Sequence, residues 1–204
     1  LHRLARLTAP ASAAGHAVDT LTLLGEIASS EPENGGNWDE LAAAAGAEGR
    51  PLVIERLITA AQSVEIPSVR HDLLDRAAVL AMAAADADTA ITCWRLALEA
   101  ESRPATLRAL RRVLEDEKRY GELALDLEER AATDPASGSA DLLQAAELWL
   151  GPANDGSRGI ALLDQLIGQL PDRLDLAERR LEVLQVLDPS RVAGAVAELL
   201  VVAR

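Results

Sequence analysis

The chain has 204 residues and a net charge of −13, which disfavours binding to a nucleic acid backbone or to an anionic lipid surface. Hydrophobic residues make up 49% of the sequence, but Phe is absent and aromatic residues reach only 2%, so Leu, Ala, Val and Ile must form nearly all of the core. Because Leu and Ala are strong helix formers, this composition predicts an all-α fold. The single cysteine, Cys93, excludes an internal disulfide, a thiolate metal cluster and a CxxC redox pair.

Residues 1–34 are predicted to form an N-terminal helical segment, which is either the end of a preceding repeat or a cap. Residues 1–8 are basic and apolar, and we interpret them as the end of a preceding helix. A helix is expected over 12–29, where apolar residues recur at helical spacing. The proline and paired glycines within 31–36 then end it.

The next predicted helix carries acidic residues in its first turn, Asp39 and Glu40, where the helix dipole favours them. We expect it to end at Gly46 and Gly49. The following helices are predicted over 51–65, 68–85, 87–101, 104–118, 120–133, 138–150, 157–169, 172–187 and 190–203. Since most connections are short, consecutive helices should form antiparallel hairpins.

An interval of about thirty-five residues recurs along the chain and is punctuated by proline residues. These are Pro32, Pro67, Pro104, Pro135 and Pro171. Because one helix pair cannot bury both of its apolar stripes alone, neighbouring pairs should stack and leave an extended groove in place of an enclosed pocket. The periodicity therefore favours a binding function over catalysis.

Small and large apolar residues recur at fixed positions within each interval. They are Trp38, Leu41, Ala42, Ala45, Ile54, Ile58 and Ala61, then Leu74, Ala77, Ala78, Ala81, Ala90, Trp94 and Ala97, then Leu107, Leu110, Leu114, Leu123 and Leu127, then Leu142, Ala145, Ala146, Trp149, Ala161 and Gly168. A fifth unit is suggested by 176–187 and 192–200. These positions resemble the signature of the tetratricopeptide repeat, a helix hairpin of thirty-four residues.

The resemblance implies a right-handed α-solenoid of antiparallel helix hairpins, whose first helices line a concave surface that binds extended or helical segments of other proteins. It places the array at 35–204, with units over 35–68, 71–103, 104–137, 139–171 and 172–204. Three positions depart from the pattern. Arg111 and Arg130 stand where the family prefers small side chains, and Gln165 stands at an apolar position, so that Leu166 should fill its place.

Some members of that family bind a terminal carboxylate through a clamp of Lys, Asn and Arg, and this chain lacks the clamp. The expected groove positions carry a mixed set of charges instead: Asp39, Asp75, Arg108, Arg112 and Glu147. The arginines on 104–118 could bind an acidic segment of a partner, because guanidinium groups pair bidentately with carboxylates. The alternative is a solvated helix face on which Arg111 and Arg112 pair with Glu115 and Asp116.

No spacing of the histidines, His2, His16 and His71, matches a metal-binding helix, and we expect neither a metal nor a cofactor. Cys93 is interpreted as a small core residue. The three tryptophans stand at positions that fill space between helices, and we expect them in the core: Trp38, Trp94 and Trp149. No phosphate-binding glycine loop or nucleophile elbow is present, so no catalytic residue is assigned.

The leading hypothesis is a non-enzymatic scaffold that binds protein partners within a multi-component bacterial-type assembly. One alternative is a structural unit that self-associates through its ends, favoured by the apolar residues Leu199, Leu200 and Val201. Another is a regulatory module of a longer protein, since the sequence begins without Met and stops within a helical pattern. No apolar run is long enough to cross a bilayer, and we expect a cytoplasmic location, with any targeting segment outside this sequence.

Overall fold

The computed structural model describes residues 13–133 and 138–202, and the expected all-α class is confirmed for them: they contain helices and no strand. The helices are α1 (Ala13–Ser30), α2 (Gly35–Ser63), α3 (Pro67–Ala83), α4 (Ala87–Ala100), α5 (Pro104–Asp116), α6 (Tyr120–Thr133), α7 (Gly138–Leu150), α8 (Gly156–Gln169), α9 (Leu174–Leu187) and α10 (Val192–Val202), with a short 3-10 turn at Pro189–Arg191. Two sequence predictions, the helix end at 1–8 and the repeat boundary at Pro135, lie outside the described residues.

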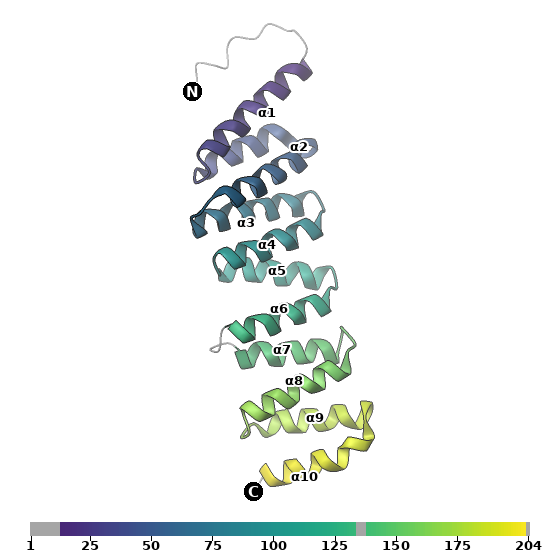
Figure 1. Ribbon diagram of the computed structural model, residues 1–204. Coiled ribbons are helices and arrows are strands. Elements are labelled where there is room, and N and C mark those ends of the chain that lie inside the picture. Colours follow the sequence, from purple (N-terminus) through teal and green to yellow (C-terminus); the bar gives the residue numbers. More distant parts are fainter. Residues whose placement is uncertain (1–12, 134–137, 203–204) are drawn as a thin grey trace. The chain divides into compact units, whose positions relative to one another are not determined.

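The chain divides into two compact units, Leu1–Val113 and Leu114–Arg204, with the boundary inside α5. In the first unit, α1 packs against α2, α2 against α3 and α3 against α4. In the second, α6 packs against α7, α7 against α8, α8 against α9 and α9 against α10. Within each unit, helices that follow one another in the sequence are thus neighbours in space (Figure 1), as a series of helix hairpins requires.

The helix α2 is interrupted at Gly46, whose φ of +61° and ψ of −161° are not helical. Such a backbone conformation strains any residue with a Cβ atom, and this explains the glycine. The ribbon folds back on itself here (Figure 1), so α2 forms two arms of a hairpin, one on each side of Gly46. The predicted break at Gly46 is therefore confirmed, whereas Gly49 does not end a helix: it lies in the second arm, which continues through Pro51 to Ser63.

Helix starts follow from local chemistry that is visible in the sequence. Pro67 begins α3, where its missing N–H costs no hydrogen bond. Asp86 caps α4, because its carboxylate accepts a hydrogen bond from the Thr89 backbone N–H at 3.0 Å. Asp155 caps α8 in the same way through the N–H of Arg158, at 3.1 Å.

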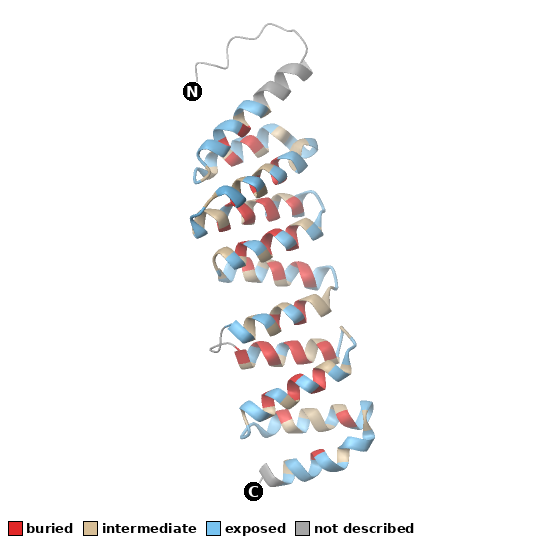
Figure 2. Ribbon diagram, viewed as in Figure 1, coloured by how far each residue is buried: buried red, intermediate tan, exposed pale blue. Residues whose placement is uncertain are grey.

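The core of each unit is made by its packed helices, along which buried positions are interspersed with exposed ones (Figure 2). Small residues of the repeat pattern are fully buried at Ala78, Ala97 and Ala146, whereas Ala42 is half-exposed. The tryptophans are buried as predicted, at Trp38, Trp94 and Trp149. Leu166 is buried beside an exposed Gln165, so it fills the apolar position as expected.

Candidate functional site

Asp39 lies in the first arm of α2 and is paired with Arg76 of α3. Gly35 makes room for this arginine: a Cβ atom at that position would lie 2.2 Å from Nη2 of Arg76. The pair joins consecutive hairpins across 37 residues of sequence. Asp39 was predicted as a groove residue for a partner, and its carboxylate already has a guanidinium neighbour within the chain.

Asp75 belongs to a hydrogen-bond network inside the first unit. Its Oδ1 atom accepts a hydrogen bond from Nε1 of Trp94 at 3.0 Å and lies 3.4 Å from Oγ1 of Thr106. The same hydroxyl is 2.9 Å from Nε2 of His71, and both His71 and Thr106 are buried. Asp75 therefore links α3, α4 and α5, and His71 is a packed residue of the core.

Glu147 in the second unit is held by Arg179 of α9. The Nε and Nη2 atoms of this arginine donate to the two carboxylate oxygens at 2.9 and 2.7 Å, a bidentate pair. The hydrogen bond from Arg179 to Glu147, together with a smaller contribution from the one to Glu182, raises the pKa of the guanidinium. The predicted ligand-binding carboxylate therefore also joins two hairpins.

Arg108 and Arg112 are predicted site residues that lie close together on the surface of the first unit. Both are exposed on α5, and their spacing of four residues places them on one helical face. The other face of α5 carries the buried residues Thr106, Leu110 and Val113. The structure thus keeps these two arginines together and gives the predicted acids, Asp39, Asp75 and Glu147, neighbours elsewhere in the chain.

Sequence reasoning missed the arginines that stand one repeat away from an acid. Arg103 pairs with Asp72 across 31 residues, and Arg158 pairs with Glu128 across 30. Arg76 and Arg179 follow the same rule with spacings of 37 and 32. Opposite charges separated by about one repeat period are the signal that could have found these contacts.

Trp149 shows why the tryptophans serve the packing and do not form a ligand platform. Its Nε1 atom donates to Oε1 of Glu128 at 2.6 Å, and the guanidinium of Arg158 lies 4.6 Å from the ring centroid. Arg158 completes the cluster through hydrogen bonds to Glu128 at 3.1 and 3.0 Å. The ring is thus covered by side chains of α6 and α8.

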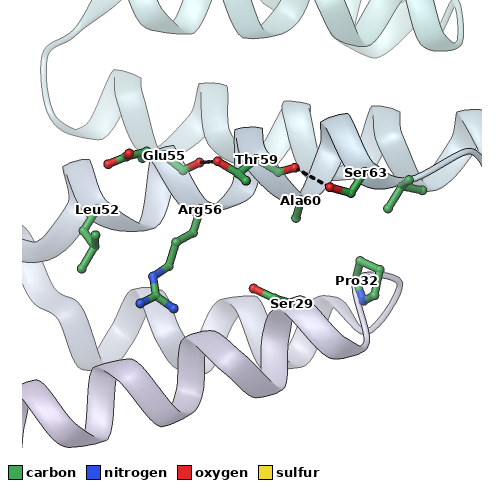
Figure 3. Close-up of a pocket in the computed structure, with 9 residues that line it drawn as sticks. Ser29, Pro32, Leu52, Glu55, Arg56, Thr59, Ala60 and Ser63 are labelled. Carbon is green, nitrogen blue, oxygen red and sulfur yellow. Dashed lines mark hydrogen bonds between the residues drawn. The ribbon is translucent and has the colours of Figure 1, made fainter.

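A hollow of about 470 Å³ lies in the first unit between α1 and the second arm of α2. Figure 3 shows Arg56 and Ser29 directed into the gap from the two facing helices, with Pro32 at one end. Its lining residues are Ser29, Pro32, Leu52, Glu55, Arg56, Thr59, Ala60, Ser63 and Val64. Sequence reasoning did not assign a site here.

Comparisons with known proteins assign no family to this chain. No family model and no curated protein matches it. Among solved structures, "MamA RS-1 ArsTM double mutant" is similar over 91% of this chain and 96% of its own, with 14% identity and a TM-score of 0.40. A likeness at this level carries no information about binding or activity.

No helix in the part of the chain that the structure describes is long and apolar enough to span a membrane. Likewise, no group of three or more His, Cys, Asp or Glu residues within 13–133 and 138–202 is arranged to hold a metal ion.

Cys93 is buried in α4, and burial, assisted by the negative charge of Asp86, raises its pKa to about 11. At pH 8 the thiolate fraction should be about two hundredfold smaller than in an unfolded chain with an ordinary cysteine pKa of about 8.5. We expect the native thiol to react with Ellman's reagent at least about a hundredfold more slowly than in 8 M urea. Equal rates in the two states would contradict the packed position of Cys93.

Proposed function

We propose that this chain is a non-enzymatic scaffold for protein–protein interactions, built as a right-handed tetratricopeptide-like solenoid over 35–204. Sequential packing of helix hairpins in each unit supports the repeat architecture. The burial of the signature residues Trp38, Ala78 and Trp149 supports the family resemblance. Such an array offers a broad surface for a partner segment, and its rigidity comes from contacts between neighbouring repeats.

The partner-binding surface that we propose is the arginine face of α5, formed by Arg108 and Arg112. The main observation in support of this surface is that both arginines are exposed on one face of α5. The acids at the other predicted positions form hydrogen bonds with residues of neighbouring helices. Two arginines at this spacing suit an acidic helix or extended segment, because each fork can bind one carboxylate bidentately.

Charge reversal at both arginines tests this proposal. The intact chain is used as bait in a lysate of its source organism, and each captured protein is then purified and titrated directly by fluorescence anisotropy. We expect Arg108→Glu with Arg112→Glu to weaken binding of the acidic partner at least tenfold, and raised salt to weaken binding to the unmodified chain.

The matched control is the double variant Arg173→Glu with Arg191→Glu, which changes the net charge by the same amount. Both residues are about half-exposed and lie in the second unit. If the control weakens binding as much as the α5 variant does, a general charge effect explains the result. If neither variant changes the affinity, the arginine face of α5 is not the binding surface.

The proposal that the chain is not an enzyme is supported by the burial of His71 and Cys93, whose side chains could otherwise act as a general base or a nucleophile. His71 shares a hydrogen bond with the hydroxyl of Thr106, and the pKa of the Cys93 thiol is raised. Neither side chain is presented to solvent.

Self-association is the second candidate function, because the last helices carry exposed apolar residues. Val186 is 80% exposed, and Leu187 and Leu200 are more than half exposed. If the chain self-associates, a second copy or a neighbouring domain would cover these apolar residues, and the chain would act as a structural unit of an assembly.

A further inference from the structure

The hollow between α1 and the second arm of α2 has the size and mixed lining of a binding pocket. Its volume of about 470 Å³ falls within the roughly 300–1,000 Å³ typical of ligand sites. Leu52, Ala60 and Val64 supply apolar surface, and Arg56 supplies a positive charge. All lining residues belong to the first unit.

Arg56 differs from the arginines near it. Arg50 donates to the carbonyl oxygen of Ala83 at 2.7 Å, and Arg70 donates to that of Val64 at 2.7 and 3.1 Å. No hydrogen bond or ion pair to the guanidinium of Arg56 is found among the described residues. Arg56 is half-buried, and no described residue competes with a ligand for its N–H donors.

The position of Arg56 depends on a glycine in the facing helix. A Cβ atom at Gly25 would lie 1.5 Å from Nη1 of Arg56, so the guanidinium occupies space that any other residue would fill. Gly25 is buried within α1, where alanine would otherwise be the better helix former. The glycine thus lets Arg56 lie against α1 at one side of the pocket.

The hydroxyl groups of the pocket are oriented as acceptors. Ser29, Thr59 and Ser63 each donate to the carbonyl oxygen four residues earlier, at 2.7, 2.9 and 3.2 Å. Since a hydroxyl has one proton and two lone pairs, these groups can still accept hydrogen bonds from a ligand. The pocket therefore offers a cation for a carboxylate and acceptors for N–H groups.

We propose that this pocket binds an acidic side chain in a peptide segment of a protein partner. The carboxylate pairs with Arg56, peptide N–H groups donate to the hydroxyls, and an adjacent aliphatic side chain contacts Leu52, which is 45% exposed. Glu55, the acidic residue of the lining, is directed along α2 and away from Arg56 (Figure 3). The site lies on helices other than α5 and does not depend on the arginine face.

Nuclear magnetic resonance of the isotopically labelled full chain tests the proposal with two probes. One is the blocked tripeptide acetyl-Leu-Glu-Leu-amide, and the other is its neutral counterpart with Gln in the centre. We expect the first to shift the side-chain Nε–H signal of Arg56 and the backbone signal of Ala60 saturably. The neutral peptide should bind at least tenfold more weakly, because it lacks the charge that Arg56 recognises.

Two variants test the assignment to this pocket. Arg56→Gln removes the charge, and Gly25→Ala displaces the guanidinium while favouring the helix, so the second variant stays folded even if the first does not. Both should weaken binding of the acidic tripeptide at least tenfold. The control Arg108→Gln should leave it unchanged, which separates this site from the proposed function.

Three results would overturn the proposal. The first is an equal response to the acidic and neutral peptides, and the second is unchanged binding in both pocket variants. The third is saturation by inorganic phosphate at a lower concentration than by the acidic peptide, which would make the pocket a phosphate site.

Discussion

Replacing Asp141 by Leu is expected to destabilise the second unit by about 3 kcal/mol, because it leaves Arg130 without its buried acceptor. The Asp141 side chain is 5% exposed and that of Arg130 is 28% exposed. Nε of Arg130 donates to Oδ2 of Asp141 at 2.6 Å, and Nη2 contacts the other carboxylate oxygen. Urea unfolding monitored by circular dichroism measures the loss.

The double variant Arg130→Met with Asp141→Leu should recover most of that stability, because an apolar pair of similar size has no charge to desolvate. A surface pair provides the control. Asp175→Leu removes the partner of Arg173, and both of those side chains are more than half exposed, so we expect little change. If Asp141→Leu and Asp175→Leu had the same effect, the pair between α6 and α7 would not be a buried structural contact.

Leu163→Ala is expected to lower the free energy of unfolding by about 2–5 kcal/mol, the range for a core leucine that leaves a cavity. Leu163 lies in α8 and is fully buried. Leu125→Ala on α6 is the matched control, because Leu125 is 44% exposed and should lose less than about 1 kcal/mol. The same urea titration compares the two. Equal losses at both positions would mean that the inward face of α8 is wrongly assigned.

Much of the fold could be predicted because it depends on local signals. Prolines at helix starts, glycines at breaks and the spacing of apolar residues act over a few residues. They placed the break at Gly46 correctly and the start of α3 within one residue of Pro67. The error at Gly49 has a physical origin. Glycine is unfavourable in a helix interior but does not end a helix when the residues around it stay helical, as they do in the second arm of α2.

The site was harder to predict because it depends on which helix faces which. Asp39, Asp75 and Glu147 were predicted as groove residues for a partner, but the sequence did not reveal that Arg76, Trp94 and Arg179 would donate to them. Each donor is separated from its acid by 19 to 37 residues in the sequence, so no local pattern links the two.

The pocket at Arg56 was hidden for a similar reason. It needs Gly25 of one helix to lie opposite Arg56 of another, and neither residue has a distinctive sequence motif. Only the packing of α1 against α2 brings them together.

Hydrogen–deuterium exchange of the intact chain, with and without its captured acidic partner, tests most directly the claim that partners bind at α5. We expect slower exchange over Pro104–Asp116 when the partner is added at saturating concentration, and no such protection in the Arg108→Glu, Arg112→Glu variant. A bound partner that leaves the exchange of α5 unchanged would contradict the account.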